Sequence, residues 1–524
     1  MSKKILYGAI ITMCVAVTTA AGVFLFIQFR GQSQEGEEDI TPYSYDENTA
    51  APVPPSPTPT QQEDIDEESN DAYDEDTYEY DPETTVGAIT LTDPRIGWHI
   101  PPTWDFDQVF PFIGGMAGVE FFEDGYWESM HILGYMNMHG EIVIPTEHRH
   151  YPEMYAYRGA PPFSEGLVAI RSEGHLAMGV FDTAGNLVIP FGNDFGWSFQ
   201  EGLLAVRRGG WNSTWGETAR WGFIDHAGNE VIPFEFELAR DFSEGRAAVL
   251  RDDNWGFIDH TGEVVIPFIF SRTGDDGHGF DIYPGFQEGL SRVSTGGSEE
   301  NEHGDWTDTT RWGFVDRYGN LVIPHIYTQA EHFADGLATV MIGSHDQRDA
   351  YGNWYSDARW GAINRAGDTV IPFEFEWINN FNDGLATARF IDCIYVVVIN
   401  NRGEIVVDRG HFRNIQSFRE GRAIANNSGW ENDTWVVGDM GFIDTEGNVA
   451  IPMIFSDVRN FSQGFAAVST GRWEGGVDNS RWGIIDLDGN IVVPIEFEDI
   501  RSFSEGFAWV RHNGLWGILR INEE

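Results

Sequence analysis

A phrase that begins with Trp-Gly recurs along this chain and constrains its fold more than any other feature. The phrase is complete in "WGFIDHAGNEVIPFEF", which starts at Trp221, and it returns 34 residues later at Trp255. No single unit of this size buries a core of its own, so repeated units must stack on one another. Full or degenerate copies start at Leu133, Met178, Trp221, Trp255, Trp312, Trp360, Val396, Met440, Trp482 and Trp516.

Two spacings inside the unit are nearly constant, although the length of the unit varies. The proline of "VIP" follows the Trp position by 12 residues, as Pro233 follows Trp221, and only the Val396 unit departs by carrying Asp408 there. In six units a further 12 residues lead to the glycine of "FSEG", for example Gly245. Most of the length variation falls between the "AxV" segment and the next Trp-Gly. These spacings predict a constant frame with loops inserted on one face.

The residues of the unit favour β structure. "GFID" and "EVIP" are short β-rich runs joined by "HAGN", where Gly228 suits a positive φ and Asp225 can accept hydrogen bonds from turn amides. Proline cannot donate to a ladder, so we expect Pro233 to end its strand. "RAAVLR" predicts a third strand, paired with the following Trp-Gly strand. "FEFELARDFSEG" then crosses to the next unit, either extended or as one helical turn.

The two ends of the array carry partial units. "FDQVFPFIGGMAGV", from Phe106 to Val119, reads as a first half-unit with Gly115 as its glycine, and "LWGILRI" closes the chain after one strand. The sequence therefore predicts an all-β fold of tandem three-stranded β-meander repeats, stacked in an open solenoid-like array. The alternative is a closed propeller-like ring. About ten units exceed the roughly four to eight blades of ordinary propellers, which favours the open array.

The units resemble the WG-repeat family. The resemblance lies in "WGFIDHAGNEVIPFEF…FSEGRAAV" and "WGIIDLDGNIVVPIEFEDIRSFSEGFAWV" and covers nearly all of residues 94–524. Proteins with this motif are mostly bacterial and functionally uncharacterised. The resemblance thus implies a β-repeat scaffold and assigns no catalytic residue. The units at Leu133 and Val396 depart furthest from the motif.

The N-terminal residues predict a membrane anchor. Lys3 and Lys4 precede an apolar run over residues 5–29, which is long enough to span the hydrocarbon core. A signal peptide cleaved after Ala20 is the alternative, but the run continues beyond that point. The lysines predict that residues 1–4 stay in the cytoplasm and that the rest of the chain lies outside the cell. We therefore expect a single-pass protein of the cell membrane.

Composition separates a linker from the repeat domain. Residues 31–93 hold 19 Asp and Glu with no Lys or Arg, and include "APVPPSPTPT". We expect residues 30–93 to be a disordered, acidic, Pro-rich linker and residues 94–524 to be the extracellular repeat domain. That domain has 64 acidic residues against 29 Arg, which argues against nucleic acid as a partner. No Lys follows Lys4.

The repeated residues are interpreted as structural. A turn-capping acid is needed once per unit, whereas a catalytic carboxylate pair is needed once per protein, so neither the "FID" aspartates nor the "FSEG" glutamates predict catalysis. Asn364 and Asn400 replace the aspartate in two units, and an amide caps a turn but is no carboxylate base. The repeated tryptophans are expected to pack in the core.

The candidate binding residues lie in the inserted loops. "WGETARWG", "WTDTTRWG" and "WYSDARWG" each place a Trp five residues before an Arg, and "RWEGGVDNSRWG" repeats the Arg at a longer interval. One interpretation is a structural hairpin whose Trp stacks on the Arg. The other is a row of exposed aromatic residues that binds a ligand. The candidates are Trp215, Arg220, Trp306, Arg311, Trp354, Arg359, Trp473 and Arg481.

Nothing in the sequence predicts a cofactor. Thr273–Asp281 and Gly297–Asp308 hold enough oxygen ligands for loose calcium binding but lack EF-hand spacing, and His148 and His150 have no convincing zinc partners. Nucleotide-binding and hydrolase motifs do not occur. The sequence favours a non-enzymatic, membrane-tethered binding or scaffold protein whose loops meet a cell-wall glycan, a peptide or another protein. A surface glycan hydrolase built on the array is the alternative, and a spacer without any ligand is a third.

Overall fold

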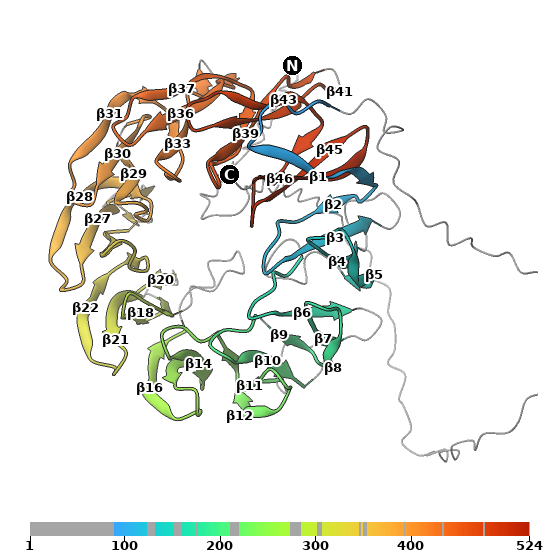
Figure 1. Ribbon diagram of the computed structural model, residues 1–524. Helices are drawn as coiled ribbons and strands as arrows, with labels where there is room; N and C mark the ends of the chain where they lie inside the picture. The colour runs from blue at the N-terminus through green and yellow to red at the C-terminus, as the bar shows by residue number, and fades with distance from the viewer. Residues whose placement is uncertain are drawn as a thin grey trace, which may run out of the picture. The chain divides into compact units, whose positions relative to one another are not determined.

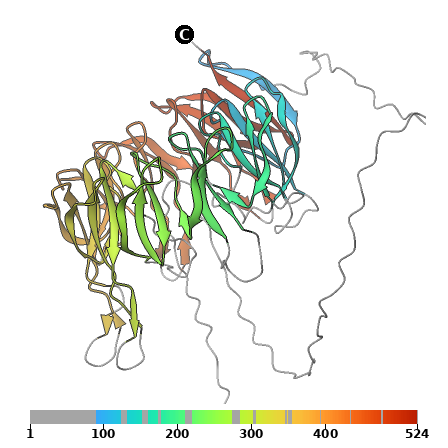
Figure 2. The ribbon, with the colours of Figure 1, turned by 90° about the horizontal axis from the view of Figure 1, so that it is seen from below.

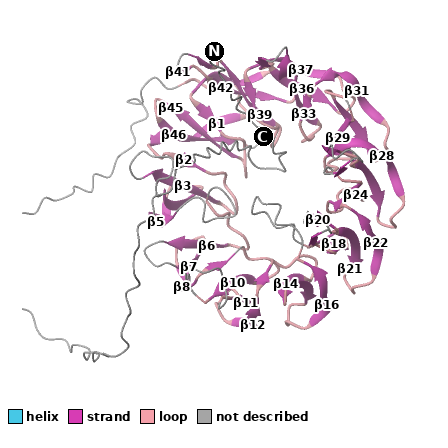
Figure 3. Ribbon diagram, turned by 180° about the vertical axis from the view of Figure 1, so that it is seen from behind, coloured by secondary structure: helices cyan, strands magenta, loops and turns pink. Residues whose placement is uncertain are grey.

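The computed structural model describes residues 89–522 except for 123–130, 151–159, 173–176, 197, 210–218, 273–283, 301–305, 345–346, 349–353, 392, 432–433 and 475–476. All described residues fall within one compact unit, Glu83–Glu524. They form strands, turns and loops with no helix among them (Figure 3). No membrane-spanning helix occurs in the residues that could be searched, and the expected anchor (5–29) and most of the expected linker lie outside them.

The described part of the repeat domain contains nine main antiparallel sheets. The seven-stranded one is counted here as two, so the sheets are numbered 1 to 10 in chain order. Sheets 1 to 3 contain β2 (Gln108–Val109), β3 (Met116–Phe122), β4 (His131–Asn137) and β5 (Ile142–His150); β6 (Leu167–Ser172), β7 (Ala177–Asp182) and β8 (Leu187–Asn193); and β9 (Phe195–Gly196), β10 (Leu204–Arg208), β11 (Arg220–Ile224) and β12 (Glu230–Phe236). Sheets 4 and 5 contain β13 (Leu238–Ala239), β14 (Ala247–Arg251), β15 (Asn254–Ile258) and β16 (Val264–Ser271); and β17 (Phe286–Gln287), β18 (Leu290–Thr295), β21 (Arg311–Asp316) and β22 (Leu321–Tyr327).

Sheets 6 and 7 are joined through the long strand β28. They contain β23 (Gln329–Ala330), β24 (Leu337–Ile342), β27 (Arg359–Asn364), β28 (Thr369–Ile378), β29 (Leu385–Phe390), β30 (Val396–Asn400) and β31 (Ile405–Phe412). Sheets 8 to 10 contain β32 (Asn414–Ile415), β33 (Arg422–Asn426), β36 (Met440–Asp444) and β37 (Val449–Phe455); β38 (Asp457–Val458), β39 (Phe465–Thr470), β42 (Arg481–Asp486) and β43 (Ile491–Phe497); and β44 (Asp499–Ile500), β45 (Phe507–His512), β46 (Leu515–Ile521) and β1 (Ile96–Trp104).

The expectation of three strands per unit is wrong for most sheets. The crossing segment is extended, and its centre forms a short first strand such as β13, so most sheets have four strands. Only sheet 2, among the described residues, has three. The added strand pairs with backbone groups at the edge of the second strand that would otherwise lack a partner in the sheet.

Trp-Gly and "VIP" are held together by a close backbone approach. Trp221 pairs with Phe236 and Phe223 with Ile232, so β12 bulges outward between these pairs. A Cβ on Gly222 would lie 2.7 Å from the carbonyl oxygen of Ile232, and glycine is therefore required there. This contact explains the constant 12-residue spacing.

The prediction that Pro233 ends its strand is wrong, because β12 continues to Phe236. Pro233 is tolerated because it lies in the bulge of an edge strand, where no partner needs its missing N–H.

The tryptophans of the motif pack in the core as predicted. Trp221, Trp255 and Trp312 are each at most 4% exposed, while Trp360 is partly buried. The two divergent units pack in the same way, since Leu133 and Val396 are also buried. Each apolar cluster joins neighbouring sheets, as where Trp221 of sheet 3 packs with Ala247 of sheet 4.

The first and last strands of the array share one sheet. β1 pairs antiparallel with β46 from Ile96–Ile521 to Trp104–Trp516 and fills the outer position of sheet 10 (Figure 1). A Cβ on Gly517 would lie 2.9 Å from the carbonyl oxygen of Ile100. The close approach of a Trp-Gly glycine to the carbonyl of an Ile-Pro pair is thus repeated between β46 and β1. This pairing joins the two ends of the array, as the ring-like alternative requires and an open stack does not.

The "FSEG" turns connect each sheet to the next. The Glu244 carboxylate of sheet 4 accepts a hydrogen bond from the Gly289 amide of sheet 5 at 2.8 Å, and the Ser243 hydroxyl donates to the Phe286 carbonyl. Glu244 has a φ of 52°, which is unfavourable for a residue with a side chain, so this acid is retained for its reach to the neighbouring sheet. The same acid-to-amide bond, with Gln463 once replacing the acid, starts at Glu165, Glu201, Glu244, Glu288, Asp335, Glu420, Gln463 and Glu505.

The last of these bonds reaches the beginning of the array. Glu505 of sheet 10 accepts hydrogen bonds from the Gly114 and Gly115 amides of sheet 1 at 2.7 and 2.8 Å. Trp509 stacks on Phe112 with a centroid distance of 5.7 Å. Sheets 10 and 1 are thus connected by the same contacts that connect neighbours along the chain.

Candidate functional site: the hairpin arms

The inserted loops of sheets 5, 6, 8 and 9 form two-stranded arms, which extend the hairpin between the second and third strands. Figure 2 shows the arms of sheets 5 and 6 standing clear of the sheets on one side. The arms pair β19 (Ser298–Glu300) with β20 (Trp306–Asp308), β25 (Gln347–Arg348) with β26 (Trp354–Tyr355), β34 (Gly429–Glu431) with β35 (Thr434–Val436), and β40 (Trp473–Glu474) with β41 (Val477–Asp478).

Three of the arms have the same base. Gly296, Gly343 and Gly471 have φ values of 90°, 78° and 82°, and an added Cβ on each would collide with a carbonyl oxygen on the opposite side of the hairpin. In sheet 5 this oxygen belongs to Thr309, and the next amide, of Thr310, is held by the Asp308 carboxylate at 2.8 Å. A fixed bend therefore sets the direction in which each arm leaves its sheet.

The four candidate arginines occupy equivalent positions at the start of the third strand. Each Nη1 donates a hydrogen bond to the carbonyl of the preceding residue, at 2.9 Å for Arg220, 2.6 Å for Arg311, 2.7 Å for Arg359 and 2.6 Å for Arg481. Arg311 and Arg481 are exposed and the other two are half-buried. The repeated geometry shows that these arginines belong to the base of the arm.

Trp306, Trp354 and Trp473, three of the four candidate tryptophans, lie on the arms themselves. The backbone of Trp306 pairs with Glu300, that of Trp354 with Arg348 and that of Trp473 with Asp478. Their side chains, and all of Trp215, lie outside the described residues. The stacking of Trp on Arg at these positions therefore stays a prediction.

The sequence patterns missed the arm of sheet 8. It pairs Trp430 with Trp435 and lacks the "RWG" signature, because Asp439 precedes Met440 where the other units have Arg-Trp. The Arg472 guanidinium of sheet 9 bonds to the Asp439 carboxylate and, at 3.3 Å, to the Val437 carbonyl. The bases of these two arms are thus in contact. Two tryptophans in an insert before "MGFID" were the signal for this arm.

The "FID" aspartates cap turns, as predicted. Asp225 accepts hydrogen bonds from the Ala227 and Asn229 amides at 2.9 and 2.8 Å and from the Asn229 side chain at 2.9 Å. The Asn229 contacts lower the pKa of Asp225. Asn364 makes the same backbone contacts in sheet 6, which confirms that the position requires an acceptor and no charge.

Two other groups have strongly shifted pKa values. Burial raises the pKa of Asp241 to about 7, although the nearby Arg240 charge opposes the shift. Burial and the Arg292 charge lower the pKa of His332 to about 3. Among the described residues, no cluster of three or more His, Cys, Asp or Glu is arranged to hold a metal ion. Thr273–Asp281 and part of Gly297–Asp308 lie outside those residues.

Many arginines have roles that suit a planar guanidinium. The Cζ atoms of Arg292, Arg459 and Arg501 lie 5.7, 4.8 and 5.6 Å from the ring centroids of Trp312, Trp482 and Trp516. A planar guanidinium stacks on an indole face in a way that the compact ammonium group of lysine does not. This accounts for arginine at these positions, while nothing in the structure explains the lack of lysine in exposed loops.

Fold and arms together define an all-β repeat protein, with one constant frame and variable hairpins. The family model described as "WG containing repeat" matches residues 178–210, 221–255, 255–297, 312–344, 360–390, 440–471 and 482–516. This chain belongs to that family of WG-repeat proteins. No curated protein matches the chain.

Several solved structures are similar in part. AztD from Citrobacter koseri is 10% identical with a TM-score of 0.28, covering 70% of this chain and 92% of its own. Sqt1 from Chaetomium thermophilum is 9% identical with a TM-score of 0.27, covering 83% and 100%. Virginiamycin B lyase from Staphylococcus aureus is 11% identical with a TM-score of 0.21, covering 69% and 93%. At such TM-scores the similarity carries no functional argument.

Proposed function

We propose that this chain is a non-enzymatic binding or scaffold protein whose hairpin arms meet a glycan, a peptide or a protein partner. The observation that carries the proposal is the repeated arm base. In three sheets a positive-φ glycine and a hydrogen-bonded arginine form the base of an arm. The length and sequence of the arm differ each time. A constant base with variable tips is typical of binding loops on a rigid scaffold.

The composition of the sheet 5 arm favours a ligand with positive charge. Residues 296–310 contain five Asp and Glu with no Lys or Arg, and include Trp306. Acidic groups attract cations over several ångströms, and an indole face adds a cation–π contact. A cationic peptide or an amino sugar carries the positive charge that both of these contacts require.

The proposal includes the location and the arrangement of the array. Residues 5–29 anchor the chain in the cell membrane, residues 30–93 act as a tether, and the repeat domain faces the cell exterior. The array is a closed ring of ten sheets, supported by the β1–β46 pairing and by the Glu505 contact with Gly114 and Gly115. A ring presents its arms in constant relative positions.

A binding screen with arm variants tests the function. Full-length protein in detergent is titrated with peptidoglycan fragments, chito-oligosaccharides and a Lys-rich peptide, and release of reducing ends is followed in parallel. The variant Trp306→Ala/Trp354→Ala/Trp473→Ala should weaken binding at least tenfold, since a buried aromatic anchor contributes about 2 kcal/mol or more. The control replaces Asp252 and Asp253 in the tight hairpin of sheet 4 with Asn-Gly and should bind normally. Binding that survives the triple change, or release of reducing ends, would overturn the proposal.

A further inference from the structure

The closing strand β1 differs from every other outer strand among the described residues in how it is attached. Elsewhere a short turn joins the third strand to the outer strand, as Asp486–Asn490 joins β42 to β43. β1 has no such turn to β46 and is connected to it only through the rest of the array. Hydrogen bonds and side-chain contacts alone hold β1 in sheet 10.

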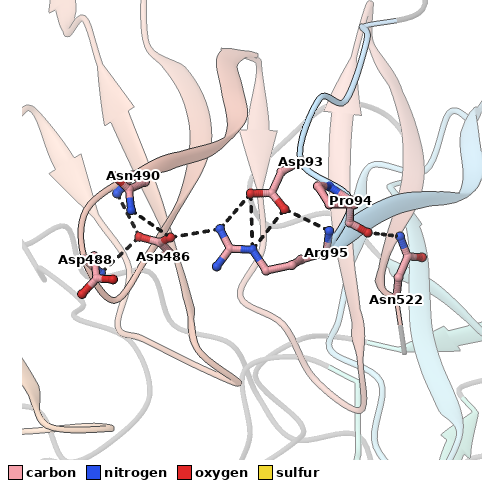
Figure 4. Close-up of polar contacts among 7 residues, drawn as sticks. All are labelled: Asp93, Pro94, Arg95, Asp486, Asp488, Asn490 and Asn522. Carbon is pink, nitrogen blue, oxygen red and sulfur yellow. Dashed lines mark hydrogen bonds and ion pairs between the residues drawn. The ribbon is translucent and has the colours of Figure 1, made fainter. Parts of the chain in front are cut away.

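A cluster of polar contacts secures the first residues of this strand (Figure 4). The Arg95 guanidinium contacts Asp93 at 2.7 Å and Asp486, in the turn of sheet 9, at 3.0 Å. Asn522, after β46, donates from its side chain to the Pro94 carbonyl at 2.7 Å and from its backbone to the Arg95 carbonyl at 2.8 Å. Arg95 thus links three segments that are far apart in sequence. We name Arg95 with Asp93 and Asp486 the clasp.

The charges of the clasp support each other. The Arg95 side chain lowers the pKa of Asp93. Burial acts to raise the pKa of Asp486, but the hydrogen bonds from Arg95, Asn490 and Asp488 together lower it. Asp486 is 10% exposed and Arg95 is 44% exposed, so solvent screens only one side of the pair. Of the turn aspartates whose contacts are described, only Asp486 pairs with an arginine from the N-terminal end of the array.

The direction of the strands determines how β1 can leave. Ile96 pairs with Ile521 and Trp104 with Trp516, so the N-terminal end of β1 lies beside the C-terminal end of β46. All preceding residues of the chain join β1 at that end. A load on them removes the β1–β46 pairs one at a time, beginning at the clasp. Sequential loading of pairs requires less force than loading all of them together.

We propose that β1 and the clasp form a releasable strap. Tension on the residues before Asp93 detaches β1, exposes the backbone edge of β46 and frees the outer side of sheet 10. The contacts of Glu505, Trp509 and Trp516 with sheet 1 do not involve β1 and keep the two ends together. The strap is independent of what the arms bind.

Hydrogen exchange of the full-length chain tests the clasp with a matched pair of variants. Asp486→Asn and Asp444→Asn keep an acceptor in equivalent turns, as Asn364 does naturally, but only Asp486→Asn loses an arginine partner. In Asp486→Asn, amides of β1 and β46 should exchange roughly three- to tenfold faster, as expected for a partly exposed ion pair. Asp444→Asn should leave them unchanged. Equal rates in the two variants would overturn the proposal.

Two further measurements keep the test decisive. Faster exchange of Asp486→Asn in β14 and β15 of sheet 4 as well would indicate that the substitution destabilises the whole array. Arg95→Ala is then used in its place, because Arg95 caps no turn. Faster exchange confined to β1 and β46 supports the strap, and unchanged rates in Arg95→Ala refute it. Pulling single chains by their two termini should give a first extension of roughly 30 Å, the length of a nine-residue strand. Asp486→Asn should lower the force of that step, and its absence in the wild-type chain would refute the strap.

Discussion

Sheets 4 and 5 differ mainly in the hairpin between their second and third strands. In sheet 4, Asp252 and Asp253 have φ values of 50° and 60° and form a two-residue turn. The Glu237 carboxylate accepts hydrogen bonds from their amides at 3.1 and 3.3 Å. Sheet 5 has an arm at this place. Sheet 10 repeats the tight form, with Asn513-Gly514 as the turn and Glu498 as its acceptor.

The two sheets share the main contacts of the frame. Each has a buried Trp, a Gly against an Ile carbonyl and an acidic residue bonded to the next sheet. The hairpin therefore varies between these two sheets while these frame contacts stay constant. The comparison locates the constant contacts in the frame and the variation in the arms, for which we propose a binding role.

The largest expected effect tests whether the stability of the frame is independent of the arm. Trp255→Ala in sheet 4 and Trp312→Ala in sheet 5 each remove a side chain that is 3% or 4% exposed, and each should cost about 3–5 kcal/mol of local stability. Native-state hydrogen exchange of β15 and β21 measures both. Losses that differ by more than about 1 kcal/mol would show that the arm contributes to the frame.

Sheet 4 also contains the buried Asp241 carboxyl, whose effect on stability depends on pH and can therefore be measured separately from the comparison with sheet 5. Asp241 has a folded pKa of about 7, above the ordinary value of 3.8. Its contribution to the free energy of unfolding is therefore fully present below pH 3.8, where the carboxyl is protonated in both states, and is lost as the pH rises through 7. Asp241→Asn should therefore stabilise sheet 4 by roughly 4 kcal/mol at pH 8 and have no effect at pH 3.5. Urea denaturation at the two pH values checks this. A variant that is equally stabilised at both would contradict the shift.

The bond between sheets should have the same strength with or without an arm. Glu244→Ala removes the bond from sheet 4 to sheet 5, and Glu288→Ala removes the one from sheet 5 to sheet 6. Each should cost about 1 kcal/mol, the usual net value of a hydrogen bond. Glu244→Gln is the control, because Gln463 makes this bond naturally. Thermal denaturation with a loss at only one of the two sites would break the comparison.

Removal of an arm should have the smallest effect on stability. Residues 296–310 are replaced with Asp-Asp and Ser271, which follows Phe270 as Glu237 follows Phe236, with Glu. These changes copy the sheet 4 hairpin and its Glu237 acceptor. The free energy of unfolding should change by less than about 1 kcal/mol, because loop length has a weak influence. Urea denaturation measures this change, and ligand titration should show weaker binding. A chain that no longer folds would show that the arms belong to the frame.

The sequence alone determined the local features of the unit. The spacing from Trp221 to Pro233, the Asp225 turn and the buried tryptophans were all predicted, because each depends on residues close in sequence or on burial of an apolar side chain. Trp215, Trp306, Trp354 and Trp473 were selected by spacing too, and their role as ligand contacts remains a prediction.

Only the tertiary structure decided which segments share a sheet. β1 completes sheet 10 across more than four hundred residues, although "HIPPTW" before Phe106 resembles "VIPFEF" and was the available signal. Glu244 looked like a local cap and bonds the next sheet instead. Pairing between strand edges depends on backbone groups that all sequences share, so local pattern fixes the unit while stacking and closure are decided by the assembled array.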